Sequence, residues 1–187
     1  MLARKQIPNC SGCEDNKDKL VWYFAYGSNM NIEQMISRIG KHADSDLKHI
    51  DKKPWIEAKK AKLVGYSLRF NHLSSGWDGM TANIVQSDQS DDTVFGVVYY
   101  INGNQLDKIH SCEGKITSKK IDIDIICEGK TLQAITFCFN DSGDSKEPPK
   151  TYLEKIMAGL KDHGYEQEVI NAVNKIANPN KISNANI

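Results

Sequence analysis

A glycine turn near the start of the chain has residue types that could hold a ligand. Tyr26-Gly27-Ser28-Asn29 stands between an apolar run and an amphipathic helical pattern. Gly27 would let the backbone approach a ligand closely, and the unpaired amides at the start of a helix would point toward an anion such as a carboxylate. An ordinary strand-to-helix turn uses the same residue types, so the tetrad alone leaves a purely structural role open.

Glu113 is the acidic residue best placed for proton transfer. Ile109 lies four residues before it and Leu106 seven, so a helix that continues to Glu113 puts its carboxylate on the apolar face. Loss of hydration there would raise the carboxyl pKa toward neutrality, where it can act as a general base. If the helix ends one residue earlier, Glu113 is instead a solvent-facing helix terminus.

Hydrophobic periodicity predicts the elements that must position these two features. A buried strand is expected over Leu20–Tyr26, and a helix follows, capped by Asn31 or Asn29, with an apolar face of Ile32, Met35, Ile36 and Ile39 and a stop at Gly40. Further strands are expected at 62–70, 81–85 and 94–101, a turn at 102–103, a short helix at 105–112, a hairpin over 121–139, and two helices on either side of Gly164. Long helical crossovers are scarce, so we expect an α+β fold with an antiparallel or mixed sheet, such as a small barrel.

Length and charge narrow the class of protein. The chain has 187 residues, 40% of them hydrophobic, which favours a single domain. Lys plus Arg and Asp plus Glu both total 24, so no net field would draw nucleic acid or an anionic membrane to the protein. No signal peptide or membrane-spanning run is recognisable, and a cytoplasmic location is expected. We expect a poorly ordered leader at 1–18, one domain at 19–178 and a polar tail at 179–187.

Neither a metal nor a cofactor is expected. Cys10 and Cys13 form a C-x-x-C, but no second pair stands at metal-binding spacing, so a redox or zinc role is the weaker interpretation. The acidic loop Ser87–Asp92 lacks the regular ligand spacing of a calcium site and is better explained as a solvated turn.

The segment Tyr23–Met30 (YFAYGSNM) resembles the YFAYGSN signature of the gamma-glutamylcyclotransferase family. Five further segments follow in the order that this family shows: 65–70 (GYSLRF), 81–84 (TANI), 94–99 (VFGVVY), 112–114 (CEG) and 148–152 (PPKTY). The resemblance extends over about 20–176, and the ordered set of motifs is far more specific than any single one.

The resemblance implies a fold and a reaction. The fold would be a small, partly open β-barrel, mixed but mostly antiparallel, with flanking helices. The reaction would convert a gamma-glutamyl amino acid into 5-oxoproline and the free amino acid. The substrate's own α-amine attacks its own γ-carbonyl, so ring closure requires no enzyme nucleophile and no metal.

The same resemblance assigns roles to individual residues. Glu113 would take a proton from the α-ammonium and return one to the departing amine, and the backbone amides of 26–29 would hold the γ-glutamyl group and meet the oxyanion. The substrate site implied by the family consists of Tyr23, Phe24, Ala25, Tyr26, Gly27, Ser28, Asn29 and Tyr152. Without the resemblance, Tyr152 would be interpreted as a core tyrosine.

Alternatives to this function remain. The leaving group could be that of a gamma-glutamyl amine or of intact glutathione, and the same fold could carry a catalytically silent ligand-binding module, although Glu113 beside Gly114 argues against that. The family usually has a tyrosine soon after its Glu-Gly, whereas 115–122 contains none and has Lys119-Lys120 near that point. This departure bears on substrate preference. A homodimer is an open option on the resemblance alone.

Overall fold

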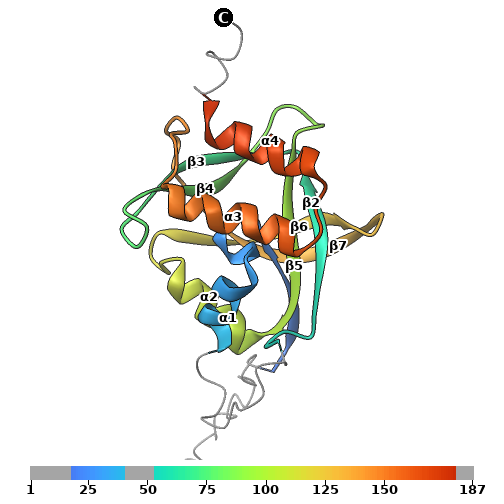
Figure 1. Ribbon diagram of the computed structural model, residues 1–187. Helices are drawn as coiled ribbons and strands as arrows, with labels where there is room; N and C mark the ends of the chain where they lie inside the picture. Colours follow the sequence, from blue (N-terminus) through green and yellow to red (C-terminus); the bar gives the residue numbers. More distant parts are fainter. Residues whose placement is uncertain (1–17, 41–52, 180–187) are drawn as a thin grey trace, which may run out of the picture.

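The computed structural model describes residues 18–40 and 53–179, which form a strand-rich body with helices on its surface (Figure 1). The predicted leader, including Cys10 and Cys13, and the predicted polar tail lie almost entirely outside the described residues. Within the described ranges, no helix is both long enough and apolar enough to cross a membrane.

Five strands close into a barrel in the order β1-β5-β2-β6-β7. Their bounds are Leu20–Ala25 for β1, Glu57–Val64 for β2, Thr93–Asn102 for β5, Ser118–Cys127 for β6 and Lys130–Phe139 for β7. Neighbouring strands are antiparallel except at the closure, where β1 meets β7 in parallel with Tyr23 opposite Ile135. The predicted mixed, mostly antiparallel barrel is confirmed, but it is closed where the resemblance implied a partly open one.

A separate two-stranded sheet pairs β3 (Tyr66–Ser74) with β4 (Gly79–Gln86). The prediction of one strand over Lys62–Phe70 is wrong, because Gly65 has a φ of 79° and separates β2 from β3. Glycine adopts this left-handed conformation without steric cost, so the chain can leave the barrel there. The predicted alternation holds beyond the break, where Leu68 and Phe70 are buried.

Within residues 18–40 and 53–179, four α-helices and one short 3₁₀-helix flank the barrel. They are η1 (Ser28–Met30), α1 (Ile32–Ile39), α2 (Gly103–Cys112), α3 (Lys150–Asp162) and α4 (Gln167–Ala177). Figure 1 shows α3 and α4 crossing one side of the barrel, with α1 and α2 below them in this view. α1 packs against α2. The short helix η1, which contains Ser28 and Asn29 of the glycine turn, packs against both α1 and α3.

Capping side chains set where the site-bearing helices begin. Asn31, one of the two predicted caps, accepts a hydrogen bond from the Gln34 amide at 3.1 Å, and α1 ends at Gly40 as expected. At the predicted turn 102–103 the chain instead begins α2 directly, through a reciprocal capping box between Asn102 and Gln105. This cap starts the helix two residues earlier than periodicity indicated, because side-chain capping uses residues outside the apolar repeat.

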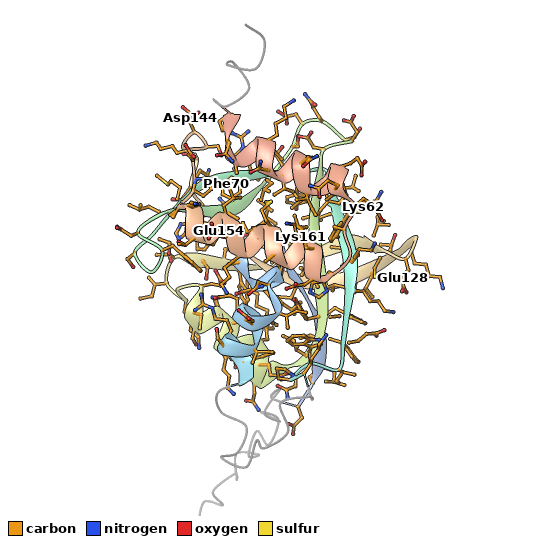
Figure 2. All side chains as sticks on the ribbon, in the orientation of Figure 1. Lys62, Phe70, Glu128, Asp144, Glu154 and Lys161 are labelled. Carbon is orange, nitrogen blue, oxygen red and sulfur yellow. The ribbon has the colours of Figure 1, made fainter. Side chains whose placement is uncertain are left out.

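The core fills the barrel and the space under the helices. Its largest fully buried side chains are Tyr99, Phe24, Phe70, Met30, Met35, Ile39, Leu63, Ile101, Ile109, Ile125, Ile156 and Leu160. Charged side chains such as Lys62, Glu128 and Lys161 project outward from the elements that carry them (Figure 2). A packed core of this kind gives the site a rigid support.

Candidate active site

The glycine turn is held from below by the barrel. It leaves the end of β1 and enters η1, whose hydrogen bonds run from the Met30 amide to the Gly27 carbonyl and from the Asn31 amide to the Ser28 carbonyl, both at 3.0 Å. The hydroxyl of Tyr99, on β5, lies 3.1 Å from the carbonyl oxygens of both Asn29 and Met30. The amides of Ser28 and Asn29 precede the bonded amides and make no hydrogen bond within the turn, while the Ser28 amide interacts with the Tyr152 hydroxyl.

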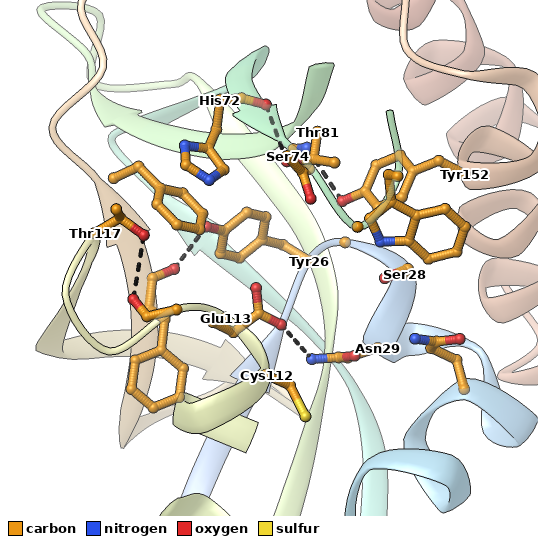
Figure 3. A pocket seen from close by; sticks show the side chains of 18 of the residues that line it. Tyr26, Ser28, Asn29, His72, Ser74, Thr81, Cys112, Glu113, Thr117 and Tyr152 are labelled. Carbon is orange, nitrogen blue, oxygen red and sulfur yellow. Dashed lines mark hydrogen bonds between the residues drawn. The ribbon is translucent and has the colours of Figure 1, made fainter. Parts of the chain in front are cut away.

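Glu113 is carried to this turn by the last turn of α2. The helix ends at Cys112, but the Glu113 amide still donates to the Ile109 carbonyl at 3.0 Å and its backbone stays helical. The carboxylate therefore keeps the face of Ile109, and it is partly buried. Its Oε1 accepts a hydrogen bond of 2.9 Å from Asn29 Nδ2 (Figure 3). The alternative of a solvent-facing terminus does not hold, even though the helix ends a residue early.

The turn and the carboxylate share a cavity of about 550 Å³. Of the residues predicted to form the substrate site, those that line it are Tyr23, Tyr26, Gly27, Ser28, Asn29, Tyr152 and the predicted base Glu113. Phe24 and Ala25 do not line it. The Phe24 side chain is fully buried, and Ala25 is 1% exposed, so both build the barrel wall that supports the turn.

Three phenols surround the carboxylate and are held neutral. Tyr23 accepts a 3.1 Å hydrogen bond from Asn29 Nδ2, Tyr26 donates to the Phe137 carbonyl at 2.6 Å, and Tyr152 accepts one from the Ala82 amide at 3.1 Å. Burial raises the pKa of each phenol, and the nearby charge of Glu113 raises it further. The phenols can therefore donate or accept hydrogen bonds but do not serve as bases near neutral pH.

Opposing effects set the pKa of Glu113. Burial raises this pKa above the ordinary value of a carboxyl group, whereas the positive charge of Arg38, the hydrogen bond from Asn29 and the His72 ring lower it. Burial is the larger effect, so the net pKa is raised. A carboxylate whose pKa is raised is a stronger base than an exposed glutamate.

Most of the remaining wall comes from residues to which the sequence analysis gave no role. Gln34 and Arg38 contribute from α1, Cys112 and Thr117 from either side of Glu113, and the β3–β4 hairpin supplies His72, Leu73, Ser74, Ser75, Gly76 and Trp77. Trp77 packs edge-on against Tyr152 with ring centroids 5.0 Å apart. The spacing of Gln34 and Arg38, four residues apart on the helix after the turn, is the one sequence signal that could have identified a part of this wall.

Lys119 and Lys120 do not reach the site. Both are exposed at the start of β6 and neither lines the cavity, although they lie near the position where the family usually has a tyrosine. From this stretch only Thr117 lines the cavity. The departure from the family pattern therefore leaves a small hydroxyl side chain at this wall and adds no cation to it.

Comparison with known proteins finds similar sequences. A model of the AIG2-like family matches residues 93–172. The gamma-glutamylcyclotransferase of Mus musculus is 26% identical over 167 residues, covering 86% of this chain and 80% of the mouse protein. That of Bos taurus is 27% identical over 175 residues, covering 88% and 85% of the two chains.

Solved structures share the fold. A gamma-glutamyl cyclotransferase structure superposes with a TM-score of 0.68 at 23% identity, covering 83% of this chain and 87% of the other. An uncharacterized protein from Homo sapiens gives the same TM-score at 25% identity, with the same coverage. The motifs, the barrel and the curated relatives together support the gamma-glutamylcyclotransferase family of AIG2-like proteins as the family that this chain resembles.

Proposed function

We propose that this protein converts a gamma-glutamyl amino acid into 5-oxoproline and the free amino acid, with Glu113 as general acid and base. The observation that carries the proposal is the 2.9 Å hydrogen bond from Asn29 to Glu113, which joins the glycine turn to the carboxylate inside one cavity. The curated relatives named gamma-glutamylcyclotransferase support the same chemistry.

The first step is proton removal from the substrate. The α-ammonium of the γ-glutamyl unit gives a proton to Glu113, whose raised pKa suits that exchange. Asn29 Oδ1 is buried and has no hydrogen-bond partner among the described residues, and an ammonium placed beside Glu113 would supply the missing donor. This unsatisfied acceptor is what a site prepared for a cationic group would contain.

Ring closure follows within the substrate. The freed α-amine forms a bond to the γ-carbonyl carbon, whose oxygen takes up the negative charge, and the amides of 26–29 would stabilise that oxyanion. When the intermediate collapses, the bond from this carbon to the leaving nitrogen breaks, and Glu113 returns its proton to the departing amine. The ring nitrogen still carries a surplus proton, which it gives to the freed Glu113 carboxylate, and the carboxylate passes this proton to the released amine or to water. The enzyme has to fold the substrate and transfer two protons in turn, both of which a rigid cavity with one tuned carboxylate can do.

A product assay tests the proposal. The purified chain is incubated separately with gamma-glutamyl-alanine, gamma-glutamyl-ethylamide and glutathione, and 5-oxoproline is measured by liquid chromatography. We expect product from gamma-glutamyl-alanine. If only gamma-glutamyl-ethylamide or only glutathione gave product, the protein would be an amine-specific or a glutathione-specific cyclotransferase instead. No product from any of the three would favour a ligand-binding module on this fold.

A further inference from the structure

Arg38 gives the cavity a cationic group that the proposed mechanism does not use. It lies on α1, one turn after Gln34, and both side chains are half-buried and line the cavity. Arg38 is close enough to Glu113 and Tyr152 for its charge to lower the pKa of both groups. The guanidinium therefore faces the same space as the reacting groups.

The guanidinium is oriented by its neighbour and still has donors to offer. With the Gln34 amide turned so that its oxygen faces the guanidinium, this oxygen accepts hydrogen bonds from Nε at 3.1 Å and from Nη2 at 3.0 Å. These contacts leave the hydrogens of Nη1 without an acceptor from Gln34. In the part of the chain that the structure describes, no carboxylate forms an ion pair with Arg38.

The other charged groups of the cavity wall are already engaged. Glu113 accepts from Asn29, and His72 Nδ1 lies 2.6 Å from Asp141 Oδ2 while its ring stacks on Phe139. Arg38 is the one Lys or Arg among the described residues that line the cavity. A half-buried guanidinium that has donors left over and no acidic partner among the described residues matches a carboxylate ligand, which it can bind through two hydrogen bonds.

The proposed substrate has a carboxylate that lacks a partner. This step rests on the proposed function, in which the amides of 26–29 hold the γ-glutamyl unit and Glu113 faces its amine. The carboxylate of the leaving amino acid then remains to be bound. We propose that Arg38, oriented by Gln34, binds this leaving-group carboxylate, so that the enzyme selects gamma-glutamyl amino acids over gamma-glutamyl amines.

Two substrates that differ only in that carboxylate provide the test. Gamma-glutamyl-alanine and gamma-glutamyl-ethylamide have the same γ-glutamyl unit and the same two-carbon leaving group, except that the ethylamide has hydrogen in place of the carboxylate. We expect Arg38→Gln to lower kcat/KM for gamma-glutamyl-alanine by roughly 10- to 100-fold, since a hydrogen-bonded ion pair is lost. Apart from a loss that both substrates share, the same variant should lower kcat/KM for the ethylamide by less than about 3-fold.

The ratio of the two values separates recognition from other effects. Arg38 also affects the pKa of Glu113, but a change in that pKa alters both reactions equally and cancels in the ratio. Arg69→Gln is the matched control, because Arg69 is exposed on β3 and does not line the cavity. Arg38→Lys, which keeps the charge but loses the planar fork, should restore part of the preference for gamma-glutamyl-alanine. Melting temperatures check that each variant is folded.

The outcomes distinguish the two proposals. Equal losses for both substrates, or a wild-type protein that does not prefer gamma-glutamyl-alanine, would overturn the role of Arg38 and leave the proposed function standing. Absence of 5-oxoproline from both substrates with the wild-type protein would overturn the proposed function, and the assignment of Arg38 with it.

Discussion

Asn29 Nδ2 donates to Glu113 Oε1 at 2.9 Å and lies 3.1 Å from the Tyr23 hydroxyl, so one amide group links the end of β1, the glycine turn and the end of α2. Asn29 and Glu113 are 84 residues apart in the sequence. Because Asn29 is 3% exposed, its position is fixed by packing as well as by these bonds. A change at either residue should therefore be measurable at the other.

Replacing Glu113 by glutamine should remove catalysis without removing the fold. Glutamine keeps the shape of the side chain, and its oxygen can still accept from Asn29, but it is not basic. We expect kcat to fall roughly 100- to 10,000-fold in a 5-oxoproline assay, with little change in substrate affinity measured by calorimetry. Activity within tenfold of the wild type would show that another group moves the proton.

The same variant should be more stable than the wild type at neutral pH. The pKa of Glu113 is raised in the folded protein, so at a pH well below the ordinary value of 4.5 the carboxyl is protonated in both states and burial carries no charge penalty. As pH rises through the folded-state pKa, ionisation of the buried group destabilises the wild-type fold, and Glu113→Gln avoids this loss. The variant's advantage in Tm should grow from near zero at that low pH to a plateau, at roughly 2–4 °C per kcal/mol. A difference independent of pH would contradict this account.

Replacing Asn29 by aspartate should move the pH dependence of the reaction. The substitution puts a second carboxyl at hydrogen-bonding distance from Glu113, and the repulsion between like charges raises the apparent pKa at which the pair loses its second proton. We expect the acid limb of the kcat/KM profile to move up by at least about one pH unit. Asn171→Asp, the same change at an exposed position of α4, should leave the profile in place. An unmoved limb in Asn29→Asp would disprove the coupling.

Local patterns in the sequence were enough to predict the two central parts of the site. The apolar run before Gly27 predicted β1, and the spacing of Leu106, Ile109 and Glu113 predicted that the carboxylate faces inward, because helical periodicity acts over a few residues. The direction of the Glu113 side chain was expected to depend on where the helix ends. The helix ends at Cys112, but Glu113, its C-cap residue, still donates its amide hydrogen to the Ile109 carbonyl. Phe24 and Ala25 were included by resemblance to a contiguous motif, whereas a strand buried on both faces turns some of its residues away from the cavity.

The rest of the site depends on contacts between distant segments. The break at Gly65 moves β3 out of the barrel, and only then can the β3–β4 hairpin bring Trp77 to the cavity. The alternating pattern on either side of Gly65 gave no sign of a change in direction. The closure of β1 on β7 likewise involves strands more than a hundred residues apart, so no local window contains it. Arg38 lies outside the apolar repeat of α1, so periodicity gave no indication that it lines a cavity.

Tyr152→Phe tests whether this tyrosine belongs to the site or only to the core. Its hydroxyl accepts from the Ala82 amide at 3.1 Å, and without it a buried N–H has no partner, which should cost about 1–3 kcal/mol of stability. Because Tyr152 also lines the cavity beside Gly27, we expect kcat/KM to fall roughly tenfold as the turn loses its support. Tyr165→Phe is the matched control, since that hydroxyl lies 2.8 Å and 2.7 Å from the carbonyls of Ala61 and Gly96, away from the cavity.

The control variant should lose comparable stability and keep kcat/KM within about twofold of the wild type. Urea unfolding and steady-state assays on the two variants check both quantities. If Tyr152→Phe had the same kcat/KM as the wild type, Tyr152 would be a core residue and not a part of the site.

The close approach of Gly27 to Tyr152 predicts a non-additive pair of substitutions. A Cβ at Gly27 would lie 2.7 Å from the Tyr152 hydroxyl oxygen, but 3.9 Å from the ring carbon that carries it. Gly27→Ala alone should therefore displace the turn or the phenol and lower both Tm and kcat/KM. The backbone at Gly27 has a negative φ of −114°, so the expected damage comes from the contact and not from a left-handed conformation.

In the double variant Gly27→Ala/Tyr152→Phe, the clashing oxygen is gone. We expect the double variant to be more stable than the sum of the single changes predicts, with a coupling free energy of roughly 0.5–3 kcal/mol from urea unfolding. Gly76→Ala is the control, because a Cβ there meets only the Ser74 hydroxyl, at 3.8 Å, although Gly76 lines the same cavity. It should add to Tyr152→Phe without coupling. Strict additivity for Gly27→Ala would show that the turn relaxes without touching the phenol, and that Tyr152 does not set the position of the glycine turn.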